Sequence, residues 1–145
     1  MILYLDTSAM IKLYIQEAGS ELIKEAIDTN RIIATAGIAY SEAISAFVRL
    51  TLLNSISKKD YEICKSSIKR DWASFFIIDV SENIIQLAAD LIEKHKIRSF
   101  DGIHLASAVL LNKQINKRVT FSSWDKKLLE SAQKEELQIL SIATA

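Results

Sequence analysis

Residues 2–9 read ILYLDTSA, and this stretch carries the strongest indication of the fold. Its first four residues, Ile2 to Leu5, are continuously apolar, which is typical of a β-strand buried on both faces. A carboxylate, Asp6, follows the strand directly. Such a strand belongs in the middle of a parallel sheet, and open α/β folds form their sites beyond the carboxyl ends of the strands. We therefore expect Asp6 to lie at a functional site.

The rest of the chain alternates between β-type runs and helical patterns. Four further apolar runs lie at residues 31–36, 75–80, 118–122 and 138–142. Helical patterns cover residues 8–27 with a break near Gly19, then 39–53, 58–74, 82–95, 101–113 and 125–135. This alternation predicts an α/β fold in three layers, α/β/α, with a central parallel sheet of five strands. The helices at 39–53 and 58–74 are too long for a simple crossover, so we expect a protruding helical hairpin.

Composition narrows the class of protein. The chain has 145 residues, half of them hydrophobic, and is most simply one domain spanning residues 1–145. Lys plus Arg and Asp plus Glu both number 18, so any nucleic-acid site must be a local patch. The single cysteine excludes an internal disulfide and fits a reducing compartment. With no apolar run of about 20 residues and no leader pattern, we expect a cytoplasmic protein without a membrane segment.

Four acidic residues are candidates for function, although each also has an ordinary structural interpretation. Asp6, Asp101 and Asp125 stand at predicted helix starts, where Asp is a favoured N-cap, and Ser123 is an alternative cap for the last helix. Glu42 has the position of a solvated helical residue. However, the helix at 101–113 is apolar nearly all round, and a carboxylate at the end of a buried helix needs a cation or several donors nearby.

Taken together, these acids predict a metal site. A doubly wound sheet can bring all four to one edge, because they follow strands or lie near helix starts. Converging carboxylates repel one another unless a divalent cation compensates, and oxygen ligands without His or Cys favour Mg²⁺ or Mn²⁺. Such a cation makes hydroxide from bound water and stabilises the leaving oxygen of a phosphodiester.

Four segments in order carry a resemblance to a known family. These are LDTSA at 5–9, AYSEA at 39–43, FDGIHLASA at 100–108 and FSSWDKKL at 121–128. Together they resemble the motifs of the PIN-domain family, and in size and layout the chain is similar to the VapC-like toxins of toxin–antitoxin pairs. The resemblance implies a Mg²⁺- or Mn²⁺-dependent endoribonuclease that cuts RNA, dimerises and is covered by a small antitoxin protein.

The resemblance also assigns roles to residues. It implies that Asp6, Glu42 and Asp101 are the main catalytic and metal-site acids, that Asp125 completes the quartet, and that Ser8 and Ser123 are supporting hydroxyls. The last motif usually has Thr and a small residue before its Asp, where this chain has Ser123 and Trp124. This departure leaves open whether Asp125 is a direct ligand. For the two histidines, the expectation is a packing or hydrogen-bonding role for His104 and a surface position for His95.

Further predictions concern the substrate and the partners. The cations nearest the acids in sequence are weak candidates for phosphate contact: Arg49, Lys12, Arg98, Lys126 and Lys127. Apolar residues of the hairpin serve either packing or an interface, and we favour an interface for Phe47, Leu52, Leu53, Tyr61, Ile68 and Trp72. A catalytically inactive PIN-like RNA- or protein-binding module is the alternative function, because a fold does not guarantee activity.

Overall fold

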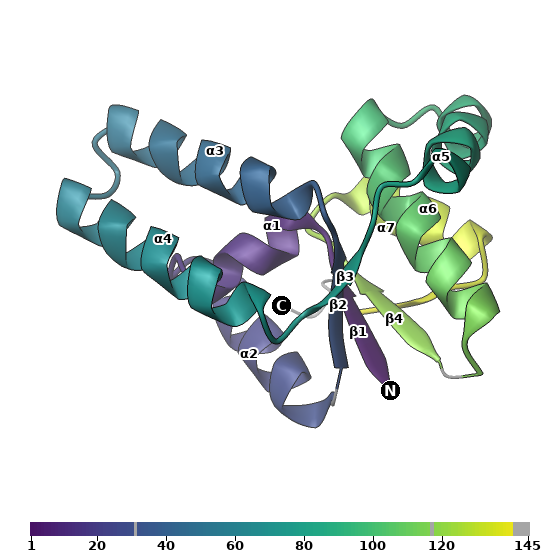
Figure 1. Ribbon diagram of the computed structural model, residues 1–145, viewed down its shortest axis with the longest axis horizontal. Coiled ribbons are helices and arrows are strands. Elements are labelled where there is room, and N and C mark those ends of the chain that lie inside the picture. Colours follow the sequence, from purple (N-terminus) through teal and green to yellow (C-terminus); the bar gives the residue numbers. More distant parts are fainter. Residues whose placement is uncertain (31, 117, 141–145) are drawn as a thin grey trace.

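The computed structural model of the protein describes residues 1–30, 32–116 and 118–140 (Figure 1). Within these residues, five parallel strands form one sheet in the order β3-β2-β1-β4-β5. Their bounds are β1 (Ile2–Leu5), β2 (Ile32–Ala36), β3 (Phe76–Ile78), β4 (Val119–Ser122) and β5 (Gln138–Ile139). The predicted central position of β1 is confirmed. Residues 31 and 141–142 of the predicted strands lie outside the described residues.

Helices cover both faces of the sheet. Their bounds are α1 (Thr7–Met10) with a 3₁₀ turn η1 (Ile11–Leu13), α2 (Ser20–Thr29), α3 (Ala39–Leu52), α4 (Lys58–Trp72), α5 (Glu82–His95), α6 (Ser99–Gln114) and α7 (Lys126–Lys134). Figure 1 shows α1 to α4 on one side and α5 to α7 on the other. Side chains of β1 alternate between the two layers: Leu3 and Leu5 pack with the first group, Ile2 and Tyr4 with the second. The three-layer α/β/α fold is confirmed.

The predicted hairpin is also confirmed, since α3 and α4 extend beyond the sheet as an antiparallel pair (Figure 1). The interface predicted for its apolar residues is wrong for Phe47 and Ile68, which are fully buried in the core. Tyr61 and Trp72 are partly buried against the same core. The two helices pack against each other, and α3 also packs against α1, so their facing sides are buried. Periodicity alone does not identify these sides. At the tip, Leu52 and Leu53 are 78% and 67% exposed.

His95 was also predicted wrongly. Its side chain is only 4% exposed, and its Nε2 lies 2.7 Å from Oε2 of Glu135. The same carboxylate oxygen lies 2.7 Å from Nζ of Lys94. The pair joins the end of α5 to the residue that follows α7, a contact between residues 40 positions apart that local sequence does not reveal. Of the helices in the described part of the chain, none is long and apolar enough to cross a membrane.

Candidate active site

The topology of the sheet brings the predicted acids together. Helices α1, α3 and α7 follow strands β1, β2 and β4, and α6 leads back to the start of β4, so all four helices begin at the carboxyl edge of the sheet. Leu5 of β1 pairs with Ser122 of β4, so the segments that carry Asp6 and Asp125 leave the sheet side by side. A cavity of about 820 Å³ at this edge is lined by Asp6, Glu42, Asp101 and Asp125.

Asp6 lies at the floor of the pocket and also caps α1. Its side chain is buried, and Oδ1 accepts hydrogen bonds from the backbone N–H of Ala9 at 2.9 Å and from the hydroxyl of Ser8 at 2.7 Å. Asp6 is therefore both the N-cap of α1 and a residue of the pocket. Burial raises the pKa of Asp6, against the opposing influence of the His104 ring and of hydrogen bonds from Ser123 and Ser8.

Asp101 is not a helix cap. Helix α6 begins at Ser99, two residues earlier than predicted, so Asp101 is its third residue, and the cap position belongs to Arg98. Burial raises the pKa of the half-buried Asp101 carboxyl, and the negative charges of Asp125 and Asp6 raise it further. Nε of Arg98 lies 3.7 Å from Oδ2 and acts in the opposite direction. The carboxylate thus faces like charges across the pocket.

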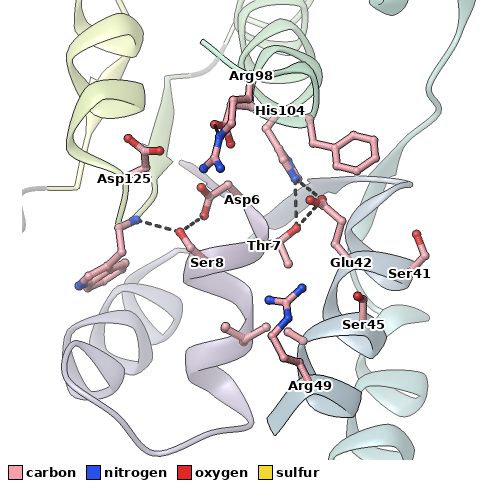
Figure 2. Close-up of a pocket in the computed structure, with 15 residues that line it drawn as sticks. Asp6, Thr7, Ser8, Ser41, Glu42, Ser45, Arg49, Arg98, His104 and Asp125 are labelled. Atoms are coloured by element: carbon pink, nitrogen blue, oxygen red, sulfur yellow. Dashed lines mark hydrogen bonds and ion pairs between the residues drawn. The ribbon is translucent and has the colours of Figure 1, made fainter. Parts of the chain in front are cut away.

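Glu42 has a different environment from Asp6 and Asp101. It lies in the first turn of α3, where its Oε1 accepts a hydrogen bond from the hydroxyl of Thr7 at 2.6 Å. Nε2 of His104 lies 2.9 Å from the same oxygen. Burial acts to raise the pKa of Glu42, but the hydrogen bonds with His104 and Thr7 outweigh it, and the pKa is lower than usual. Figure 2 shows this cluster opposite Asp6 and Asp125.

The segment between β4 and α7 holds the fourth acid. Asp125, not Ser123, caps α7, because its Oδ1 accepts a hydrogen bond from the backbone N–H of Leu128 at 3.1 Å. The buried Ser123 hydroxyl accepts from the N–H of Asp125 at 3.0 Å. The Ser8 hydroxyl accepts from the N–H of Trp124 at 2.9 Å while donating to Asp6. Both serines therefore contact the acid-bearing segments and tie them together.

Of the basic residues that are candidates for phosphate contact, only two line the pocket. Arg49 and Arg98 both line the pocket. Lys12 does not, because its buried Nζ pairs with Oε1 of Glu17 at 2.8 Å and lies over the Trp124 ring, 4.6 Å from the ring centroid. Nζ of Lys127 donates to the carbonyl of Lys96 at 2.7 Å, outside the residues that line the pocket. Lys126 is an exposed residue at the start of α7 and likewise does not line it.

Comparison with known proteins places this fold and pocket in a family. The family model described as PIN domain matches residues 3–139. The chain belongs to the PIN domain family. Among curated proteins, this PIN domain is similar to Ribonuclease VapC45 of Mycobacterium tuberculosis, with 25% identity over 131 residues that cover 88% of this chain and 86% of that one.

Solved structures share the fold of this PIN domain. FitAcB from Neisseria gonorrhoeae matches with a TM-score of 0.70 and 16% identity over 97% of both chains. A structure described as a toxin–antitoxin complex from Klebsiella pneumoniae matches with a TM-score of 0.62 and 20% identity, covering 86% of this chain and 88% of that one. At these identities the likeness establishes the arrangement of strands and helices.

The donor set of this PIN domain fits a hard divalent cation in its chemistry. Asp6, Asp101 and Asp125 supply oxygen donors to one pocket, and the pKa of Asp101 is raised by burial and by the charges of Asp125 and Asp6, both of which a bound cation would offset. Among the residues that the structure describes, no three His, Cys, Asp or Glu side chains are gathered closely enough to hold an ion as they stand. The carboxylates would therefore have to converge when an ion binds.

Two features of the pocket were missed by the sequence analysis. The first is Thr7, whose hydroxyl bonds Glu42; its place between Asp6 and Ser8 carries no separate signal. The second is Phe100, which lines the pocket although 55% of its surface is exposed. Its position directly before Asp101 in the first turn of α6 was the only available clue. For His104, the predicted hydrogen-bonding role is confirmed, with contacts to Tyr4, Thr7 and Glu42.

Proposed function

We propose that residues 1–145 form a single nuclease domain, a Mg²⁺- or Mn²⁺-dependent endoribonuclease that hydrolyses RNA phosphodiester bonds and acts as the toxin of a toxin–antitoxin pair. The observation that carries this proposal is the gathering of Asp6, Glu42, Asp101 and Asp125 around one pocket of a PIN domain. The name of the curated relative, a VapC ribonuclease, supports the reaction class. The single cysteine and the RNA substrate are consistent with action in the cytoplasm.

In this proposal the acidic side chains bind the cation, and neighbouring hydrogen-bond donors orient those side chains. Asp6, Glu42 and Asp101 are the main ligands, and Asp125 completes the set. When bound, the cation supplies a hydroxide nucleophile at neutral pH and stabilises the leaving oxygen. Ser8 and the N–H of Ala9 orient Asp6, which keeps one carboxylate fixed at the end of β1. Asp6 and Asp101, whose pKa values are raised, would be held fully ionised by the cation.

Two arginines are the proposed phosphate contacts. Arg98 and Arg49 line the pocket, and Figure 2 shows them on opposite sides of Thr7. An RNA backbone that crosses the pocket would place neighbouring phosphates near the two guanidinium groups, which bind phosphate oxygens in a fixed fork. The chain carries no net charge, so these local contacts rather than a global field would hold RNA.

The proposed partners are an antitoxin protein and a second copy of the chain. Solved structures of the same fold include one described as a toxin–antitoxin complex. On the hairpin, apolar side chains remain exposed at Val48, Leu52, Leu53 and Ile63. Replacing both Leu52 and Leu53 by Asp should weaken dimerisation or antitoxin binding in light scattering and leave the fold intact. If the masses of the dimer and of the antitoxin complex are both unchanged, the hairpin tip is not part of either interface.

Cleavage of a mixed RNA pool by the purified chain tests the reaction. We expect endonucleolytic products with Mg²⁺ or Mn²⁺, loss of products in excess EDTA, and recovery when the metal is restored. Equal cleavage in EDTA would contradict the metal mechanism. RNA binding without cleavage under every metal condition would favour the inactive binding module.

A further inference from the structure

A connected set of buried and partly buried polar side chains lies on the Glu42 side of the pocket. His104 is 2% exposed, and its Nδ1 lies 2.8 Å from the hydroxyl oxygen of the fully buried Tyr4. Its Nε2 lies 2.9 Å from Oε1 of Glu42 and 3.2 Å from the hydroxyl oxygen of Thr7. The Thr7 hydroxyl in turn donates to the same Oε1 at 2.6 Å (Figure 2). The set joins β1, α1, α3 and α6.

We propose that His104 is a positioning residue that, together with Thr7, fixes Glu42 through Oε1 and thereby presents Oε2 to the cation. This inference rests on the proposed metal-dependent function. Among the described residues, Oε1 has two hydrogen-bonding partners and Oε2 has none. Glu42 lines the pocket, and its side chain is 22% exposed, so the oxygen without a partner has room to face a ligand.

The hydrogen atoms can be assigned consistently. The Thr7 hydroxyl hydrogen goes to Glu42, so the N–H at Nε2 of His104 points at Oε1 and at the lone pairs of Thr7. Nδ1 then accepts the hydrogen of Tyr4, and burial raises the pKa of Tyr4, which keeps that hydrogen in place. A protonated ring would keep its bonds to Glu42 and turn Nδ1–H toward the Tyr4 oxygen. The positioning of Glu42 is therefore the same for both charge states.

A direct ligand role for His104 does not fit this arrangement. Both ring nitrogens already have partners, and the ring is almost completely buried. To reach a cation, the ring would have to give up Tyr4 or Glu42 and leave buried polar atoms unsatisfied. His104 lies one helical turn after Asp101, so the same helix brings both side chains to the lining of the pocket, where the His104 ring is bonded to Glu42.

The chain contains a second buried His–Glu pair that serves as a matched control. His95 and His104 have side chains that are 4% and 2% exposed, and each has Nε2 within 2.9 Å of a glutamate oxygen. Glu135, the partner of His95, is also paired with Lys94 and does not line the pocket. Loss of either histidine removes a buried hydrogen bond, but only loss of His104 should change cation binding.

Mn²⁺ affinity, measured by electron paramagnetic resonance, separates positioning from folding. Asn at position 104 can keep a polar group near Nδ1 but is too short to reach Glu42, whereas Gln can place a donor near Nε2. We expect His104→Asn to bind Mn²⁺ about 10-fold more weakly, a loss typical of residues that orient a ligand. His104→Gln should recover most of that affinity and of the RNase activity. His95→Asn should keep the parental Mn²⁺ affinity even if its melting temperature falls.

The Glu42→Gln background shows whether His104 acts through Glu42. There, adding His104→Asn should cause no further loss of Mn²⁺ affinity. If the parent protein itself binds no Mn²⁺, the proposed function fails and this inference fails with it. If the parent binds Mn²⁺ and His104→Asn binds it equally well, this inference alone is wrong. Circular dichroism shows whether each variant is folded. If His104→Asn does not fold, the test uses His104→Gln. A folded His104→Gln variant with parental Mn²⁺ affinity supports the inference, and a folded His104→Gln variant with about 10-fold weaker Mn²⁺ affinity contradicts it.

Discussion

The two sides of the pocket differ in how their negative charge is compensated. On one side, Asp6 and Asp101 have raised pKa values, through burial first and, for Asp101, through the nearby charges of Asp125 and Asp6. On the other side, hydrogen bonds with His104 and Thr7 hold the pKa of Glu42 below its usual value. A cation would therefore offset the burial of both aspartates and the repulsion at Asp101, whereas Glu42 is already stabilised as a carboxylate before any ion binds.

Neutralising Asp101 should cause the strongest loss of activity. Asp101→Asn should lower RNA cleavage by about 10²–10³-fold, the range seen when one electrostatic partner of a transition state is removed. The control is Asp79→Asn, since Asp79 is an exposed acid just after β3 that does not line the pocket. Initial rates of cleavage at saturating Mn²⁺ measure both. If Asp101→Asn and Asp79→Asn are equally active, Asp101 contributes no more to cleavage than an ordinary surface acid.

A smaller effect is expected on the opposite side of the pocket. Glu42→Gln keeps an oxygen that can accept from Thr7 and His104 but removes the charge. We expect roughly 10- to 100-fold weaker Mn²⁺ binding, with activity recovered in part at high Mn²⁺. Activity measured as a function of Mn²⁺ concentration shows the difference. If Glu42→Gln were as damaging at every Mn²⁺ concentration as Asp101→Asn, the two sides of the pocket would not be distinct.

The pH dependence of stability should show the same contrast in EDTA. Asp101 has a raised pKa in the folded state, so the folded protein binds its proton more tightly, and this group costs stability as pH rises above the usual value of 3.8. For Glu42 the pKa is lowered, so it contributes stability above the usual value of 4.5 that is lost as pH falls through the lowered pKa. Asp101→Asn should therefore gain in melting temperature over the parent between pH 4 and pH 7, and Glu42→Gln should lose.

The sequence predicts features that depend on local patterns better than features that depend on contacts between distant residues. The strand at residues 2–5 and the helix at 82–95 follow from local apolar patterns and agree with the structure. The acids were found because strand ends and helix starts meet at one edge of a parallel sheet. The faces of the hairpin helices and the burial of His95 depend on contacts between distant residues, such as the 40 positions between His95 and Glu135.

The contact between His104 and Glu42 has the same character, because the two residues are 62 positions apart. The predicted start of the helix that carries Asp101 was two residues too late. Arg98 has extended backbone and is the N-cap, so the helix begins at Ser99. A shift of two residues turned an expected cap into a side chain that faces the pocket. Local pattern thus identified the residue, and only tertiary structure showed what it contacts.

Removing a pocket arginine should change RNA binding only slightly. Arg49→Ala should reduce the slope of log affinity against log salt concentration by about 0.7, the value for one phosphate contact to a single strand. Lys12→Ala should leave the slope unchanged, because Lys12 is paired with Glu17 and does not line the pocket. Fluorescence anisotropy with a labelled single-stranded RNA, in an Asp101→Asn background that prevents cleavage, measures both. A larger change for Lys12 would contradict the assignment.

Thermal melting of the parent and of Asp101→Asn, each in EDTA and in excess Mn²⁺, shows whether the acidic pocket binds a divalent cation. Mn²⁺ that binds only the folded state at 100 times its dissociation constant should stabilise the parent by about 2.7 kcal/mol. In EDTA, the variant should melt above the parent, because removing a half-buried charge that Asp125 and Asp6 repel outweighs the lost interaction with the α6 dipole. We expect the variant to lose most of the Mn²⁺ stabilisation. An unchanged Mn²⁺ shift in the variant, or no shift in the parent, would contradict this expectation.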